Sequence, residues 1–329
     1  MREYKILEND SWQRLDKFLK KLLPNASSSL VYKFNRKNKI KVNSKREDNE
    51  YKLQIWDIVK IFLNDTEFDT LTKKVEELKL EVREEFDKKN IVYEDGEVLV
   101  INKEPWINVH SWDHKTKESN VISQVQDYLW NKLNSLTFKP SLVHRIDRDT
   151  SGILIIWKKK DILTKLVNDF KDHKKVKKIY YAIVLGQLPS KSWTIDKKLL
   201  RIEWAKNEDK VQISDKWQTA ITNYKVLNEI VLETPSWKKI ISEVEVEILT
   251  WRMHQIRVHL SSLSCPILWD DKYWDKQFNA YLSKNFWLKR QALHAWKIEF
   301  FHYVKDKKVF LEAKIKEDLE NFIKKIWQK

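Results

Sequence analysis

The chain has 329 residues but only 3 glycines, against 16 tryptophans. Glycine enters left-handed backbone conformations without strain, so a fold with many turns depends on it. Ordinary usage of about 7% would give roughly 23 glycines in a chain of this length. The glycines and tryptophans together number 19, which is close to that expectation. So few glycines allow few tight turns, unless some of the positions written as tryptophan are the turn positions where glycine is expected.

The rest of the composition predicts a globular protein with a basic surface. Hydrophobic residues make up 42% of the chain, and the formal net charge is +15. The length is sufficient for about two domains with sizeable cores. A basic excess spread over the chain favours a polyanionic partner, and nucleic acid is the usual one. The alternative is a Lys-rich, highly soluble protein without such a partner.

Cysteine usage and the N-terminus predict the cellular setting. The single cysteine, Cys265, excludes an intrachain disulfide and a cysteine-based zinc site. The N-terminal sequence MREYKILENDSWQRLDKFLK has no apolar signal core, and no run approaches membrane-spanning length. We therefore expect a protein of the reducing cytoplasm with no membrane partner.

Charge divides the chain into three segments. Residues 1–63 carry a net charge of +7, whereas residues 64–88 carry a net charge of −4. The acidic segment, NDTEFDTLTKKVEELKLEVREEFDK, is typical of a linker that is partly helical. Residues 89–329 contain the strand-like runs of a larger domain. We expect an N-terminal module, an acidic linker and a C-terminal domain.

The N-terminal segment predicts two helices and a small sheet. Leucine and phenylalanine recur at helical spacing from Leu15 to Leu23, where Pro24 stops the helix. Ser27 and its neighbouring serines can cap a second helix, from Leu30 to about Asn38. The exposed face of that helix carries Lys33, Arg36 and Lys37.

The runs IKVNSK and IWDIVKIFL then read as short strands. Two basic helices and a small sheet favour a compact RNA-binding module. A DNA reader is disfavoured because neither helix has a base-reading face of Arg, Asn or Gln. A small solvated α+β domain without a nucleic-acid partner is the alternative.

The C-terminal segment predicts an α+β pattern without regular βαβ alternation. The run NIVYEDGEVLVINKE indicates a hairpin that turns at Asp95-Gly96. Further strand candidates are GILIIW, KIYYAIVLG, VEVEILT and KIEFF, and one helix candidate is DILTKLVNDFKDH.

The densest group of reactive side chains lies in LVHRIDRDTSGILII. Asp147 stands between Arg145 and Arg148 and is followed by an apolar strand. Nearby guanidinium groups favour the ionised form of a carboxylate. Such a carboxylate can act as a nucleophile or stabilise developing positive charge. The arginines can also bind phosphates. A purely structural Arg–Asp network at a strand end is the alternative.

Several further motifs follow in a fixed order. They are INKEPWINVHSW, KKIYYAIVLG, WRMHQIRVHLSSLSCPILWDDKYWDK and RQALHAWKIEF. Together with HRIDRDTSGILII they resemble the RluA family of RNA pseudouridine synthases, nearest its RluC/RluD-like branch. The resemblance runs from about residue 89 to the end. The N-terminal runs QRLDKFLKKLLP, IKVN and WDIVKI resemble the small αL-type domain that this branch shares with a small-subunit ribosomal protein.

The resemblance assigns roles to matching positions. It implies that Asp147 is the catalytic aspartate at the ribose–uracil bond and that Tyr180 packs on the uracil ring. It implies that Arg257 pairs with the catalytic carboxylate and that Arg145 fills the base stack when the uridine flips out. From the sequence alone, Tyr180 could instead be a core aromatic residue of a strand, and Arg257 a surface charge on a strand.

The resemblance also implies the fold and the reaction. The expected fold is α+β, with a small αL-type RNA-binding domain and a large, mixed, mainly antiparallel-sheet catalytic domain. The expected activity is isomerisation of specific uridines, in large-subunit ribosomal RNA, without a metal or cofactor. We expect a monomer that binds RNA and not DNA.

Two other functions remain open at this point. A non-catalytic RNA-binding or ribosome-assembly factor of the same fold is one of them. The other is a glycosidase-like or nuclease hydrolase with paired carboxylates, although Asp147 and Asp149 are only two residues apart.

The histidines predict no metal site. His254 and His259 lie five apart in a run that reads as a strand, so they would face opposite sides. His110, His144 and His294 are interpreted as structural residues or RNA contacts, without a catalytic role.

The tryptophans fall where the resembling family has glycine. The clearest positions are Trp106, Trp112, Trp251, Trp269 and Trp274, followed by Trp12, Trp56 and Trp217. The summed free-energy cost of so many glycine-to-tryptophan changes at turns would exceed the free energy of unfolding of a typical domain. Our hypothesis is that UGA codons, read as glycine in the organism, have been translated as tryptophan. The rival hypothesis is a Trp-rich protein whose indoles stack on RNA bases.

Overall fold

The computed structural model describes residues 1–72, 84–110, 119–129, 132–133, 135–172, 175–204, 208–215, 217–234, 237–273 and 276–327. The helices are α1 (Leu15–Leu22), α2 (Ser28–Arg36), α3 (Asp65–Thr72), α4 (Val121–Leu129), α5 (Lys160–Asp172), α6 (Gln255–Ser261), α7 (Lys276–Phe286) and α8 (Glu317–Trp327). The strands are β1 (Arg2–Lys5), β2 (Ile40–Val42), β3 (Ile58–Ile61), β4 (Ile91–Glu94), β5 (Val98–Lys103), β6 (Ser141–Leu142), β7 (Ser151–Trp157), β8 (Lys177–Leu185), β9 (Ser192–Asp196), β10 (Leu199–Trp204), β11 (Glu208–Ile213), β12 (Ile221–Thr234), β13 (Trp237–Ile248), β14 (Leu293–His302) and β15 (Lys307–Glu312).

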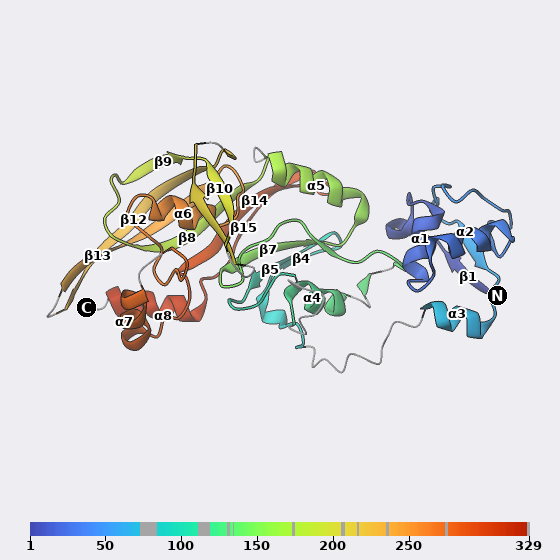
Figure 1. Cartoon of the computed structure of the whole chain (residues 1–329), viewed down its shortest axis with the longest axis horizontal. Helices are drawn as coiled ribbons and strands as arrows, with labels where there is room; N and C mark the ends of the chain where they lie inside the picture. The colour runs from blue at the N-terminus through green and yellow to red at the C-terminus, as the bar shows by residue number, and fades with distance from the viewer. Residues whose placement is uncertain are drawn as a thin grey trace. The chain divides into compact units, whose positions relative to one another are not determined.

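The chain forms two compact units (Figure 1). The first comprises Met1–Phe86, Gln124–Pro140 and Lys158–Asp161, and the second comprises Asp87–Ser123, Ser141–Trp157 and Ile162–Lys329. None of the helices among the described residues combines the length and apolar character that spanning a bilayer requires.

The first unit contains the predicted pair of helices and the small sheet. Strands β1, β3 and β2 form a three-stranded antiparallel sheet in that order. The apolar face of α1 is buried in the core of this unit. The Ser27 hydroxyl accepts a hydrogen bond from the Leu30 backbone N–H, as an N-cap residue should. The helix that it caps ends at Arg36, two residues before the predicted end.

The segment predicted as an acidic linker begins with a helix. Helix α3 packs Phe68 and Leu71 into the same core cluster as α1 and α2, so this stretch belongs to the first unit. Residues 73–83 lie outside the described part of the chain. The division at residues 63 and 88 therefore stays a prediction.

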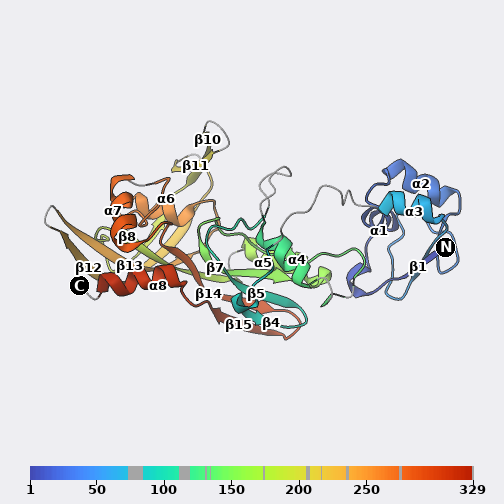
Figure 2. The same cartoon turned by 90° about the horizontal axis from the view of Figure 1, so that it is seen from below.

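The second unit is built on a ten-stranded sheet. Its strand order is β4-β5-β7-β14-β8-β13-β12-β9, with β15 paired to β14 and β6 paired to β7. Every pair is antiparallel except β7 with β14. Figure 2 shows β12 and β13 at one end of this unit, and β4, β5 and β15 at the other. The predicted α+β fold with a mainly antiparallel sheet is confirmed, including the hairpin at Asp95-Gly96.

Gly152 permits the parallel contact between β7 and β14. At φ = +113° it lies opposite Ala295, and a Cβ atom there would lie 2.3 Å from the Ala295 carbonyl oxygen. No side chain can occupy that space. The close approach of β7 to β14 brings the loop that precedes β7 next to Gln291, which lies just before β14.

The prediction of a strand across the run WRMHQIRVH is wrong, because its second half, from Gln255 on, lies in helix α6. Ile256, Val258 and Leu260 alternate as in a strand, but residues 255–260 are buried on all sides. An apolar pattern does not reveal a helix face when every face is buried. The Gln255 Oε1 atom accepts hydrogen bonds from Thr250 Oγ1 and the Arg252 N–H, which fixes the start of the helix. Arg257 and both histidines of this run therefore belong to the helix or its N-cap.

Several tryptophans occupy the backbone conformation that favours glycine. Among the described residues, five of the eleven non-glycine residues with positive φ are tryptophans. They are Trp12 (58°), Trp56 (75°), Trp106 (64°), Trp269 (60°) and Trp287 (62°). A left-handed conformation costs an L-residue about 1–2 kcal/mol. All except Trp269 are also between 47% and 73% exposed, so burial does not offset that cost.

This finding supports the hypothesis that these positions are glycine in the cell. Four of the five were predicted from the motifs, whereas Trp287 was not. Trp251 lies outside the left-handed region. Trp112 and Trp274 lie outside the described residues.

The Trp287→Gly variant is expected to be more stable than the chain as written, by about 0.5–1 kcal/mol, because glycine relieves the backbone strain. Trp193 provides the matched control, since it is 63% exposed but lies in strand β9. Trp193→Gly should lower the stability by about 1 kcal/mol. Thermal unfolding measures both variants, and equal destabilisation by the two would contradict the strain argument.

Candidate active site

Asp147 lies on the loop between β6 and β7, and buried cations hold the backbone of this loop. The Lys103 ammonium, at the end of β5, donates to the carbonyls of Arg148 (2.8 Å), Ile107 (3.0 Å) and Glu104 (2.7 Å). The Arg290 guanidinium donates to the Asp149 carbonyl at 3.3 Å. Lys103 and Arg290 are 1% and 2% exposed. These hydrogen bonds to its carbonyl groups therefore fix the backbone of the loop.

Arg257 binds three carboxylates at once. Its Nε and Nη2 atoms donate to the two oxygens of Asp270 at 2.6 and 2.7 Å, in a bidentate pair. Its Nη1 atom donates to Asp147 Oδ2 at 3.2 Å, and Nη2 also reaches Asp271 Oδ1 at 3.2 Å. Asp270 is fully buried and accepts from the backbone N–H groups of Lys272 and Tyr273. The guanidinium is thus held rigidly with one nitrogen presented to Asp147.

The surroundings keep the Asp147 carboxylate ionised. Burial acts to raise its pKa, but the charge of Arg257 opposes this, together with hydrogen bonds from Arg257 and Gln291. The result is a pKa below the usual value. The side chain is nevertheless 32% exposed and therefore accessible.

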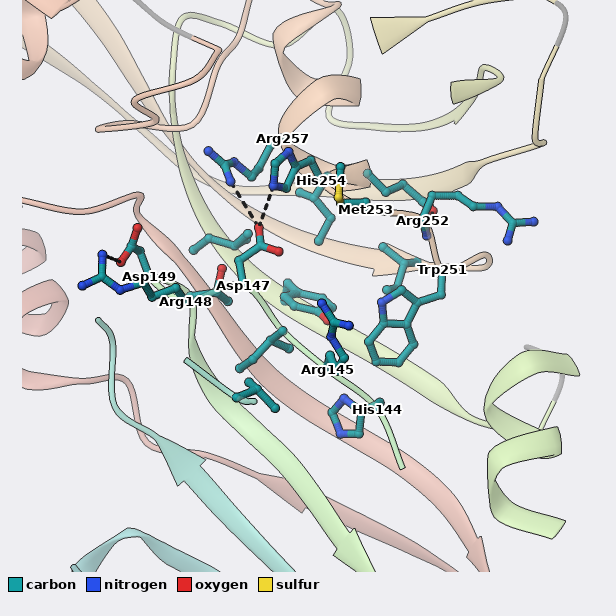
Figure 3. Close-up of a pocket in the computed structure, with 18 of the residues that line it drawn as sticks. His144, Arg145, Asp147, Arg148, Asp149, Trp251, Arg252, Met253, His254 and Arg257 are labelled. Atoms are coloured by element: carbon teal, nitrogen blue, oxygen red, sulfur yellow. Dashed lines mark hydrogen bonds and ion pairs between the residues drawn. The ribbon is translucent and has the colours of Figure 1, made fainter. Parts of the chain in front are cut away.

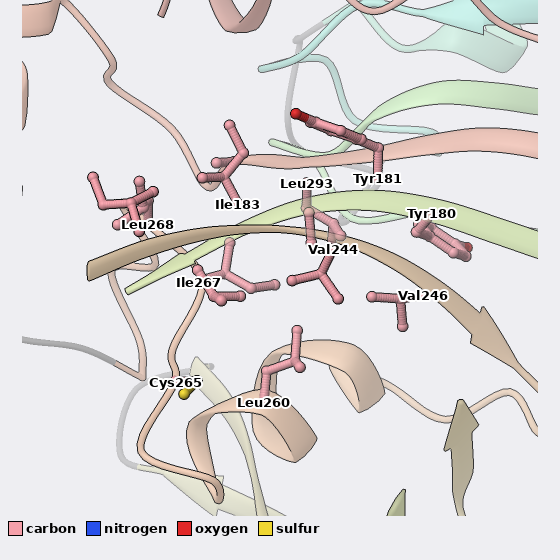
Figure 4. Close-up of a cluster of buried hydrophobic side chains, with 14 of the residues drawn as sticks. Tyr180, Tyr181, Ile183, Val244, Val246, Leu260, Cys265, Ile267, Leu268 and Leu293 are labelled. Atoms are coloured by element: carbon pink, nitrogen blue, oxygen red, sulfur yellow. The ribbon is translucent and has the colours of Figure 1, made fainter. Parts of the chain in front are cut away.

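Tyr180 extends from β8 into the same site. It is 7% exposed, and burial together with the charge of Asp147 raises the pKa of its phenol well above the ordinary value. The ring is therefore neutral. Figure 4 shows Tyr180 at the edge of the core cluster that contains Val244, Val246 and Leu260. The sheet and helix α6 thus support the ring.

These side chains line a pocket of about 1050 Å³ in the second unit. In Figure 3, Asp147 lies at its centre, with Arg257 and His254 directed at the same carboxylate oxygen. Both polar and apolar side chains form the wall, among them Val109, Ile146, Tyr180, Met253 and Leu293. A pocket of this size is at the upper end of the usual range for small ligands, roughly 300–1,000 Å³.

The predicted site residues fall into two groups. Asp147, Tyr180 and Arg257 meet in the pocket, and Arg145 and Arg148 belong to its exposed rim. Figure 3 shows Arg148 beside Asp149, on the opposite side of Asp147 from Arg145. Three further predicted residues, Lys33, Arg36 and Lys37, are exposed on or next to α2 in the first unit.

Sequence reasoning missed several residues of the site. Asp270 and Tyr273 were inside a quoted motif but received no role, and His254 was considered only as a metal ligand. The signal for Asp270 was its place in WDDKY, close to Arg257 in the chain. Lys103 also stood in a quoted motif, INKEPW. Its hydrogen bonds to backbone carbonyls cannot be read from a sequence.

Trp251 covers two buried polar groups at the side of the pocket. The Lys178 ammonium lies 4.4 Å from the centre of the indole and has no hydrogen-bond partner among the residues that the structure describes. The His144 ring lies 5.0 Å from it and accepts a hydrogen bond from the Ile155 N–H. Burial lowers the pKa of Lys178 to about 8. The identity of residue 251 therefore decides how far Lys178 is shielded from water.

The Arg257→Gln variant is expected to raise the pKa of Asp147, because burial then acts with less positive charge to oppose it. In the parent protein the lowered pKa adds stability above the unfolded-state pKa, and this is lost as pH falls through the folded-state pKa. A carboxyl ¹³C titration measures the change. The remote, exposed Lys238→Gln variant is the control, and an unchanged Asp147 pKa in Arg257→Gln would refute the assignment.

Comparisons with known proteins agree with this geometry. Residues 97–262 match the family model described as RNA pseudouridylate synthase. The chain is 34% identical to the ribosomal large subunit pseudouridine synthase C of Buchnera aphidicola subsp. Baizongia pistaciae, over 94% of this chain and 92% of the relative. It is also 34% identical to the protein of that name from Vibrio cholerae, over 98% of this chain and 96% of the relative.

A solved structure gives the same fold. Human RNA Pseudouridylate Synthase Domain Containing 4 aligns with a TM-score of 0.57 and 22% identity, over 73% of this chain and 93% of the human chain. The resemblance that the motifs carry is confirmed. This chain belongs to the RluA family of RNA pseudouridine synthases.

Proposed function

We propose that this chain converts specific uridines of large-subunit ribosomal RNA to pseudouridine, with Asp147 as the catalytic carboxylate. The observation that carries the proposal is the Asp147–Arg257 pair inside a pocket of about 1050 Å³. The two relatives that match nearly the whole chain are named for this activity on the large ribosomal subunit.

The reaction is an isomerisation, and its atoms balance within the uridine. The bond between N1 of uracil and C1′ of ribose breaks, and a bond between C5 and C1′ forms. C5 loses a proton and N1 gains one, so no redox equivalent is consumed. The enzyme must hold the detached base, turn it, and keep water away from C1′.

The site residues fit these requirements. The ionised Asp147 carboxylate can attack or stabilise the electron-poor ribose as the base leaves. Arg257 keeps that carboxylate charged and oriented. The neutral Tyr180 ring provides an aromatic surface for the uracil, and the apolar side chains of the wall, such as Ile146 and Leu293, offer no hydrogen bonds to water.

RNA binding is assigned to exposed basic side chains in both units. A uridine inside a helix must be flipped out before it can enter the pocket. Arg145, on the exposed rim, is suited to fill the vacated place in the stack, and Arg148 to bind a phosphate. The basic residues on or next to α2 provide the N-terminal RNA contact. The proposal includes a monomer in the cytoplasm, with RNA and not DNA as its partner.

The other two functions are less well supported. A non-catalytic assembly factor would not need the buried Asp270–Arg257–Asp147 arrangement. A hydrolase would release uracil with its C5 hydrogen intact, whereas an isomerase loses that hydrogen. The product therefore distinguishes the two chemistries.

Replacement of Asp147 tests the catalytic assignment. Asp147→Asn and Asp147→Ala should each lower pseudouridine formation on large-subunit ribosomal RNA by about three orders of magnitude or more. Mass spectrometry of nuclease-digested RNA measures the product. Asp306→Asn, in an exposed turn, is the control. If conversion survived in both Asp147 variants, this residue would not be the catalytic carboxylate.

Replacement of the α2 cations tests the N-terminal contact. The triple variant Lys33→Ala, Arg36→Ala, Lys37→Ala should bind RNA more weakly and reduce the salt dependence of log K by about 2. A matched triple variant in the same unit changes three other exposed cations, Lys45, Arg46 and Lys52. Equal losses in the two triple variants would show a diffuse charge effect rather than a contact made by α2.

A further inference from the structure

His254 occupies an unusual place beside the catalytic carboxylate. It is the N-cap residue of α6, and its backbone is left-handed at φ = 53° and ψ = 19°. Its side chain is 10% exposed, and Nε2 lies 3.9 Å from Asp147 Oδ2. Left-handed backbone at a non-glycine residue is strained, and such strain is concentrated at functional sites. This conformation places the ring against Asp147.

Tyr273 fixes the other side of the His254 ring. The Tyr273 Oη atom lies 2.9 Å from His254 Nδ1 and accepts a hydrogen bond from the Val211 backbone N–H at 2.9 Å. A backbone N–H can only donate, so the phenol proton is available for Nδ1. Burial raises the pKa of Tyr273 to about 12, so the proton stays on the phenol at neutral pH.

The direction of these hydrogen bonds determines the tautomer of His254. Burial lowers the pKa of His254 to about 4, so at neutral pH the ring is neutral. A neutral imidazole has one N–H group and one lone pair. Because the ionised Asp147 carboxylate that Nε2 faces can only accept, the hydrogen is favoured on Nε2, and Nδ1 is left to accept from the Tyr273 phenol. The Nε2–H group therefore faces Asp147.

His254 and Arg257 face the same oxygen of Asp147. Arg257 Nη1 lies 3.2 Å from Oδ2, the atom that His254 Nε2 faces. Tyr273 touches both partners, since its ring also lies 5.3 Å from the Arg257 guanidinium. One oxygen of the carboxylate thus faces a cation from helix α6 and a neutral imidazole from the N-cap of that helix.

We propose that His254 is a positioning residue of the reaction. Held by Tyr273 as the Nε2–H tautomer, it helps Arg257 to fix the rotation of the Asp147 carboxylate toward the flipped uridine. This proposal rests on the proposed function. The tautomer itself, however, is a property of the free protein and can be measured without any activity.

The tautomer is tested by ¹⁵N spectra of histidine-labelled protein. The unaltered chain should show His254 protonated on Nε2, and Tyr273→Phe should shift the signal toward a mixture of tautomers. Protonation on Nδ1 in the unaltered chain would overturn the proposal. The control is Tyr181→Phe, which removes a buried hydroxyl that is hydrogen-bonded to Glu243 and lies outside the pocket. It should leave the His254 signal unchanged.

The positioning role is tested by single-turnover kinetics. In the His254→Asn variant the asparagine tolerates left-handed backbone, but its side chain is too short to reach Asp147. This variant should lower the single-turnover rate about 10-fold or more, with RNA affinity unchanged. His254→Gln, whose amide can replace Nε2–H, should recover part of that loss. Because Tyr273 acts through His254, Tyr273→Phe should cost little more in the His254→Asn background. Full additivity of the two losses would contradict the proposal, as would an unchanged rate in His254→Asn.

Failure of the proposed function would look different. If the unaltered chain and Tyr181→Phe form no pseudouridine while His254 carries its hydrogen on Nε2, the assigned reaction is wrong and the hydrogen-bond geometry is right. If the unaltered chain is active and His254→Asn equals it, the reaction is right and the positioning role is wrong.

Discussion

The rest of the site depends on one guanidinium group. Arg257 is 5% exposed in its side chain, and such a cation is tolerated in the interior only when its hydrogen bonds are satisfied. Asp270 meets that need with two short bonds, which leaves the opposite nitrogen directed at Asp147. Helix α6, the segment after Ile267 and the loop before β7 are thereby joined at one point. The geometry of the carboxylate follows from this junction.

The backbone around the junction is fixed independently of the side chains that react. Lys103 and Arg290 bind the consecutive carbonyls of Arg148 and Asp149. Gly152 lets β7 approach β14 so closely that Gln291, just before β14, reaches Thr150, just before β7. Preorganisation of this kind lowers the reorganisation needed when charge develops in a reaction.

Much of this arrangement could be predicted from the sequence, and the limits have physical causes. The apolar runs of β7 and β8 predicted strands correctly, and the motifs indicated the meeting of Asp147, Tyr180 and Arg257. Helix α6 was predicted as a strand because an element buried on all sides has no amphipathic period. The Val211 N–H that orients Tyr273 has no sequence signal. Trp287 was not predicted to be a glycine position because none of the motifs covers it, although its backbone is left-handed.

The most direct test of the account is the rate at which Asp270→Asn releases tritium from RNA labelled at C5 of uridine. Only the isomerisation releases this hydrogen, and the bidentate pair with Asp270 holds Arg257 against Asp147. Loss of the bidentate pair should slow release about 10-fold or more in a single turnover, with RNA affinity and the unfolding midpoint of the first unit unchanged. Release at the unaltered rate would contradict the claim that the Arg257 junction sets the geometry of the catalytic carboxylate.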